Sequence, residues 1–294
     1  MNVPSSNVPK RNEFQEFARW VWNLPFAVKV FAAMILLIYV RVVFEAQQMW
    51  ARDDAYSHGY LIFPIVLALL WADRAAIRQA RPEPTAMGLP IIAVGLLLQV
   101  MGFLLRLVFV SMVSLPIVLA GTVLLLHGKE LWKAVRFPIC FLFFAAPLPG
   151  ILLSAPSQSV QSISTSGAAA SMKGIGYPIL QTGNILELPG VTLEVAEVCS
   201  GFRKLFALVA FASLYGYLFN ASPGRRMILL LSAVPIAIVA NILRISGLIA
   251  VASEWGLPGL HRAHDGAEVV VVVLAYTAFA LLGKALGCKT VRYA

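Results

Sequence analysis

The feature that most constrains this sequence is a series of long apolar blocks separated by short polar connections. An α-helix needs about 20 apolar residues to cross the hydrocarbon core of a bilayer, and most of the blocks approach that length. Because lipid offers the backbone no hydrogen-bond partners, such blocks cross it as helices. We therefore predict an all-α polytopic membrane protein with about eight transmembrane helices. The blocks cover roughly 25–44, 59–72, 88–106, 109–126, 137–153, 202–219, 227–250 and 268–286.

Composition and charge agree with a membrane protein. Hydrophobic residues make up 60% of the chain and charged residues 13%, whereas a soluble domain carries about 25% charged residues. The net charge of +9 would suggest nucleic acid in a soluble protein. Here most basic residues lie in short loops, where they determine topology and contact lipid headgroups. We expect membrane lipid as a partner and no nucleic acid.

The basic residues also predict the orientation of the chain. They concentrate in the N-terminal segment, every second loop and the C-terminal tail, which places both ends in the cytoplasm. The first 20 residues are polar, so we expect no cleavable signal peptide. The sequence then divides into a cytoplasmic N-terminal segment (1–24), a transmembrane domain (25–287) and a cytoplasmic tail (288–294).

Three connections are predicted on the extracytoplasmic side. The first is 45–58, and the third is 252–267, which holds two histidines. The second, 154–200, is the longest. Its small polar first half can lie along the interface as a weak amphipathic helix. Its second half, 177–198, has turn residues between short apolar runs, and we predict a small β-hairpin that leads into Cys199, before the sixth span.

Polar residues stand out near three consecutive spans. Cys199 precedes the sixth span, Arg244 lies inside the seventh apolar block, and His261 and His264 precede the eighth. Arg244 is roughly 18 residues from the cytoplasmic end of its span, or about 27 Å along a helix. Cys199, Arg244 and His264 are therefore predicted at one membrane level, on the outer side.

The chemistry of these three side chains is complementary. A thiolate is a strong nucleophile and is stabilised by a helix N-terminus or a nearby cation. Histidine can transfer a proton near neutral pH, and arginine can stabilise an oxyanion. Together they fit acyl transfer through a thioester. A structural cysteine, an interfacial histidine and an Arg244 that reaches the headgroups remain the simpler alternatives, although a charge inside an apolar block is costly.

Other functional classes fit the sequence less well. Cys199, His261 and His264 could bind zinc, but a His-Glu-x-x-His signature is missing and a nearby arginine opposes metal binding. A Gly-x-Ser-x-Gly nucleophile elbow is also missing. We therefore expect neither a metal nor a cofactor. The main alternative is a non-enzymatic transporter or an assembly subunit of an envelope or exopolysaccharide system, although transporters place polar residues at the midplane of repeat-related helices.

The sequence resembles the exosortase/archaeosortase family over about residues 30–285. The most specific part of the resemblance is the cysteine motif, Val195-Ala196-Glu197-Val198-Cys199-Ser200-Gly201-Phe202-Arg203. Tyr56-Ser57-His58-Gly59 is similar to an early family signature, and Asn241 to Arg244 resembles its Asn-x-x-Arg motif. A histidine before the last span completes the set.

The resemblance implies a cysteine protease or transpeptidase of the bacterial plasma membrane, with its active site on the extracytoplasmic side. Its partners would be exported proteins with a C-terminal sorting tail: a short Pro-Glu-Pro-like motif, a transmembrane helix and a basic cluster. Cys199 would be the nucleophile, Arg244 the electrostatic stabiliser and His264 the general acid/base. Whether water or an amine resolves the thioester stays open.

Four further residues are candidates for substrate binding: His58, Glu197, Asn241 and His261. His58 lies on the active-site side, although an ordinary polar loop explains it equally well. The sequence departs from the family around His264, because Gly266 follows it early and valines come next. His261 therefore remains an alternative to His264 as the general acid/base.

Overall fold

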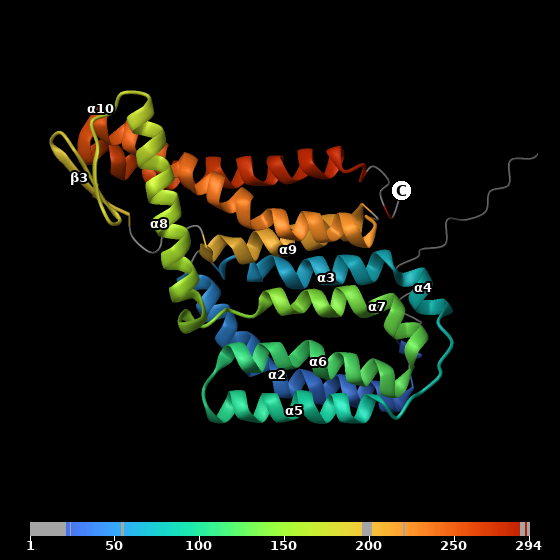
Figure 1. Ribbon diagram of the computed structural model, residues 1–294. Coiled ribbons are helices and arrows are strands. Elements are labelled where there is room, and N and C mark those ends of the chain that lie inside the picture. Colours follow the sequence, from blue (N-terminus) through green and yellow to red (C-terminus); the bar gives the residue numbers. More distant parts are fainter. Residues whose placement is uncertain are drawn as a thin grey trace, which may run out of the picture. The chain divides into compact units, whose positions relative to one another are not determined.

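The computed structural model describes residues 22–23, 25–53, 56–195, 202–219, 221–288 and 292. In this part of the chain, long helices and one small sheet make up the regular structure (Figure 1). The chain forms two compact units, and the second begins at Pro147 and also includes residues 53–58. The predicted all-α fold of a polytopic membrane protein is confirmed.

Helices are the regular structure of the first unit in its described residues. Among them, α5 (Gly88–Leu104) and α6 (Val108–Leu126) pack most extensively, and Gly88, Gly95 and Gly102 lie seven residues apart on the contact face of α5. A Cβ atom on Gly102 would lie 2.3 Å from Ser111 Oγ of α6, so a larger residue would separate the helices. The elements are α2 (Phe26–Arg52), α3 (Gly59–Ala72), α4 (Arg74–Gln79), α5 (Gly88–Leu104), α6 (Val108–Leu126), α7 (Lys129–Phe141) and the 3-10 helix η2 (Leu142–Ala145).

A buried hydrogen-bonded group joins three helices of this unit. The hydroxyls of Tyr39 and Ser114 lie 2.7 Å apart, and Ser114 also donates to the amide oxygen of Gln99 at 3.2 Å. All three side chains are buried. Because apolar surroundings penalise an unpaired polar group, these contacts specify how α2, α5 and α6 pack.

The second unit contains a small antiparallel sheet and three helices. The helices are α8 (Gly150–Gly174), α9 (Phe202–Leu218) and α10 (Pro223–Ala285). The strands are β1 (Leu180–Thr182), β2 (Ile185–Leu188) and β3 (Val191–Glu194), in the order β1-β2-β3. The sheet therefore has one strand more than the predicted hairpin. Gly183 and Gly190, with φ of 63° and 79°, allow the two tight turns.

The last two predicted spans both lie in α10, on either side of a kink. Residues 252–267 were predicted as a connection, but their backbone is helical except at Gly256, whose non-helical φ of 61° and ψ of −162° divides α10 into two helices. That conformation is almost exclusive to glycine. The prediction failed because polar residues after the kink were interpreted as a loop, whereas apolar side chains of the same segment pack on the sheet.

Two other boundaries were also predicted wrongly. The block 137–153 is not one span, since α7 ends at Phe141 and α8 begins at Gly150. Pro147 and Pro149 lie between them and cannot donate the amide hydrogen bonds of a continuous helix. The first outer connection is shorter than predicted, because α2 continues to Arg52. The expected helix in the first half of 154–200 is present, since residues 154–174 form most of α8, whereas its location at the membrane interface stays a prediction.

Length and composition support several membrane crossings. Three described helices can cross a bilayer: α2, α6 and the portion of α10 from Pro223 to Leu260. Shorter apolar helices occur at Gly59–Ala72, Gly88–Leu104, Leu205–Leu218 and Val269–Ala285. The total of eight spans and the cytoplasmic location of both ends stay predictions.

Candidate functional site

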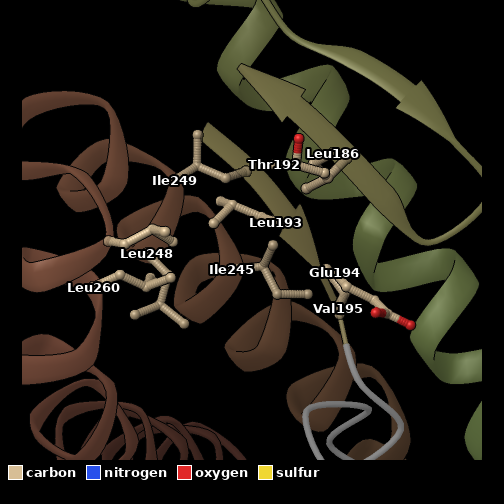
Figure 2. A pocket seen from close by; sticks show the side chains of 10 residues that line it. Leu186, Thr192, Leu193, Glu194, Val195, Ile245, Leu248, Ile249 and Leu260 are labelled. Carbon is tan, nitrogen blue, oxygen red and sulfur yellow. The ribbon is translucent and has the colours of Figure 1, made fainter. Parts of the chain in front are cut away.

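The sheet positions the candidate site by packing against α8 and α10. In β2, burial alternates between exposed and buried residues, so Leu186 and Leu188 face the interior. They join Leu193 of β3 in a cluster with Ile245 and Ile249 of α10. Figure 2 shows Leu193 directed toward these α10 side chains. The strand that leads to the cysteine motif is therefore held against the helix that carries Arg244.

Arg244 is buried in the second unit. Only 4% of its surface is exposed, although it lies on an apolar membrane-spanning helix. The adjacent residue, Ile245, lines the same cavity as Val195, at the end of β3. Burying a guanidinium costs free energy unless the surroundings compensate its charge. The burial of Arg244 therefore argues against a lipid anchor, for which an exposed side chain is expected.

Asn241 lies on α10 three residues before Arg244, and the two side chains share one side of the helix. Asn241 is 3% exposed, and its amide Nδ2 has no hydrogen-bond acceptor among the described residues. Buried polar groups are normally hydrogen-bonded. Asn241 is thus a buried amide donor beside Arg244, which is consistent with its predicted role in substrate binding.

A buried polar stripe on α8 was missed by the sequence analysis as part of the site. Ser157, Gln161, Ser164 and Thr165 recur at helical spacing and are all at most 5% exposed. The hydroxyl groups of the two serines and the threonine have no hydrogen-bond partner among the described residues. This spacing was visible in the sequence, but a serine-rich helix at the membrane interface shows the same composition.

Gln161 makes the most informative contact of this stripe. Its side-chain Nε2 donates a hydrogen bond to the backbone carbonyl of Val195. The amide of Val195 donates in turn to the carbonyl of Asn184 at 3.0 Å. Both polar backbone groups of Val195 are thus hydrogen-bonded. Val195 is the first residue of the cysteine motif, so these hydrogen bonds anchor the start of that motif.

His58 is brought to the start of α9. Its ring centroid lies 5.9 Å from that of Phe206 in a T-shaped contact. Tyr56 fixes the same turn by donating from its hydroxyl to the carbonyl of Leu148 at 2.7 Å. Since Phe206 is on the early turns of the helix that follows Cys199, this contact is consistent with the predicted role of His58.

The other predicted site residues are described less fully. Cys199 and Glu197 lie outside the described residues. His261 and His264 lie on the helical backbone of α10 after its kink, but their side chains are not described. The helical backbone agrees with the expectation that these two positions share one helix face. The mutual placement of the thiol, guanidinium and imidazole stays a prediction.

The comparison with protein families accounts for most of the chain. The family model described as Transmembrane exosortase (Exosortase_EpsH) matches residues 50–281, more than three quarters of the sequence. The chain belongs to the exosortase family. Exosortases are generally proteases or transpeptidases. The match includes His58, the sheet, the buried stripe of α8 and α10 past His264. No curated protein and no solved structure matches this exosortase.

Proposed function

We propose that this exosortase is a cysteine protease or transpeptidase that cleaves the C-terminal sorting tails of exported proteins. It would act in the bacterial plasma membrane, with both termini in the cytoplasm and its active site on the outer side. The observation that carries this proposal is the buried Arg244, next to the sheet from which the chain continues into the cysteine motif.

Chain length supports a site shared by the cysteine and the arginine. Cys199 follows Val195 by four residues, which span at most about 14 Å when fully extended. It precedes Phe202, the first residue of α9, by three residues, or at most about 11 Å. Val195 and Ile245, the neighbour of Arg244, line one cavity. The connection is therefore short enough for Cys199 to reach the helix that carries Arg244, which supports the proposal.

The proposed reaction begins with attack by the Cys199 thiolate on the scissile carbonyl carbon. Arg244 stabilises the negative oxygen of the tetrahedral intermediate, and the interaction is strong because the site is shielded from water. The carbon–nitrogen bond then breaks, and His264 gives a proton to the leaving amine. Water or an amine acceptor attacks the resulting thioester, which releases the thiolate and leaves either an acid or a new amide.

The remaining candidates would hold the substrate. Asn241 has a buried amide donor that can bind a substrate carbonyl oxygen, which would satisfy the hydrogen-bonding capacity noted above. His58 lies near the start of α9, and His261 and Glu197 flank the proposed catalytic residues in the sequence. No metal or cofactor takes part in this proposal.

The direct test is the fate of a tailed substrate co-expressed with the enzyme. Wild-type enzyme is expected to shorten the substrate, and mass spectrometry of the new C-terminus would show the cleavage position and any attached acceptor. Cys199→Ala should leave the substrate at full length. Cys140→Ser, which alters an exposed cysteine of α7, serves as the matched control and should process normally. Normal processing by Cys199→Ala would refute the proposal.

A further inference from the structure

Among the described residues, one edge of β3 has no partner strand. Val195 donates its amide toward β2, to Asn184. Because backbone groups alternate in direction along an antiparallel strand, those of Thr192 and Glu194 point the other way. β3 is the last strand in the described sheet, so no described strand pairs with that edge. Both residues are exposed, and the edge can therefore accept an additional strand.

An apolar cavity adjoins the same strand. Its volume is about 140 Å³, it is partly open, and its lining includes Leu193 and Val195 of the sheet segment and Ile245, Leu248 and Leu260 of α10 (Figure 2). An engineered cavity of about 150 Å³ with a similar aliphatic lining binds benzene. The cavity is thus large enough for one compact apolar group.

The kink in α10 completes this cavity. Leu248 precedes Gly256, whereas Leu260 follows it, and both line the same space. Figure 2 shows the charged side chain of Glu194 directed away from these leucines, on the side of α8. The part of the cavity next to α10 is consequently apolar. A charged side chain of a bound molecule would lose its hydration there without a compensating partner.

We infer that the edge of β3 and this cavity together form a substrate-binding groove. A stretch of the substrate next to the scissile bond pairs with β3 as an added strand, and one apolar side chain, of the size of valine, leucine or proline, enters the cavity. This inference rests on the proposed function and specifies how that site selects its substrate.

Two observations favour a peptide over a lipid chain as the occupant. A peptide satisfies the backbone groups of Thr192 and Glu194, which an acyl chain would leave without hydrogen bonds. In the sequence, β3 ends at Glu194, one residue before the cysteine motif starts at Val195, so a peptide paired with β3 lies beside the start of that motif. An apolar side chain in the cavity then sets which bond reaches the sulfur.

The test is a size-compensation experiment between enzyme and substrate. Each substrate position within four residues of the cleaved bond is changed in turn to Ala, Leu, Phe and Asp. These substrates are processed by wild-type enzyme, Leu248→Ala and Leu248→Phe. We expect one position at which wild-type enzyme prefers Leu over Phe or Asp by about tenfold or more. Leu248→Ala should accept Phe there, and Leu248→Phe should accept only Ala.

Matched variants distinguish a change in the size of the cavity from a general effect on folding. Ile175→Phe adds similar bulk at an exposed position after α8 and should retain the wild-type preference. Leu260→Phe narrows the cavity from the other side of the kink and should reproduce the effect of Leu248→Phe. The inference would be overturned if every cavity variant kept the wild-type preference at every substrate position. It would also be overturned if processing by enzyme in lipid vesicles depended on the lipid composition but not on the substrate side chains.

A binding measurement keeps the inference testable without turnover. In a Cys199→Ala, Cys140→Ser protein treated with a mild thiol oxidant, Thr192→Cys should form a disulfide with a substrate cysteine placed beside the selected position. Equal crosslinking from every substrate position would contradict the proposed pairing of the substrate with β3. Cys199-dependent cleavage without size compensation would refute only the groove, whereas cleavage by Cys199→Ala would refute the proposed function itself.

Discussion

The side-chain amide of Gln161 donates to the backbone carbonyl of Val195, which joins α8 to the end of β3 across 34 residues of sequence. Gln161 is 5% exposed, so water cannot readily replace this bond if it is lost. An unsatisfied buried carbonyl costs about 1–3 kcal/mol. Because Val195 begins the segment that leads to Cys199, we propose that Gln161 is a positioning residue.

We predict that Gln161→Met, which keeps the length of the side chain but removes the donor, lowers the turnover number by about tenfold or more. A misplacement of about 1 Å can cost two orders of magnitude in rate. The rate of Cys199 alkylation against pH should change as well, which a loss of global stability alone would not produce. Gln158→Met, one turn earlier on an exposed face, is the control. If Gln161→Met and Gln158→Met showed the same dependence of Cys199 alkylation on pH, Gln161 would have only a structural role.

Arg244→Lys tests the proposed oxyanion stabiliser. Lysine keeps the positive charge but loses the planar set of donors. Removal of one oxyanion donor typically costs about 100- to 1,000-fold in turnover number, and we expect a loss of this order. The measurement is the rate of substrate shortening, with Arg262→Lys as a control on an exposed part of α10. Wild-type rates for Arg244→Lys would favour a lipid-anchoring role.

Thiol labelling addresses the state of Cys199 without a substrate. In a Cys140→Ser background, an impermeant thiolate-selective reagent added from outside should modify Cys199 below about pH 8, since an ordinary thiol has a pKa of about 8.5. Arg244→Met removes a cation that stabilises the thiolate, so the labelling midpoint should rise toward that ordinary value. Resistance of Cys199 to labelling at every pH would indicate a structural cysteine.

The sequence predicted the helices well because the bilayer imposes a length on every apolar segment. It failed at Pro147, Pro149 and Gly256. At these positions single residues determine where a helix ends or bends, although the apolar composition of the chain hardly changes. Within the site, Arg244 was identifiable because a charge on an apolar helix is costly. Gln161 was not, because its burial depends on a contact with Val195 that only the folded chain creates.

Gly256→Ala tests the kink that closes the apolar cavity. At φ 61° and ψ −162° an alanine is strained, even though the nearest side-chain atom to its Cβ, Pro258 Cδ, would lie at an ordinary 3.7 Å. The strain costs about 1–3 kcal/mol, and relief of it by a change in the backbone at the kink would move Leu260 relative to Leu248 and alter the cavity lining. We therefore expect a lower thermal stability in detergent and a weaker preference for an apolar substrate residue.

Gly247→Ala provides the matched control for the kink. Gly247 lies on the same helix, where a Cβ atom would meet no described atom within 4 Å. Alanine is favoured over glycine inside a helix by about 1 kcal/mol, so this variant should be as stable as the wild type or more stable. It should also keep the wild-type substrate preference. If Gly256→Ala matched Gly247→Ala in both measurements, the helix would tolerate an alanine at the kink, and glycine would not be required to shape the cavity.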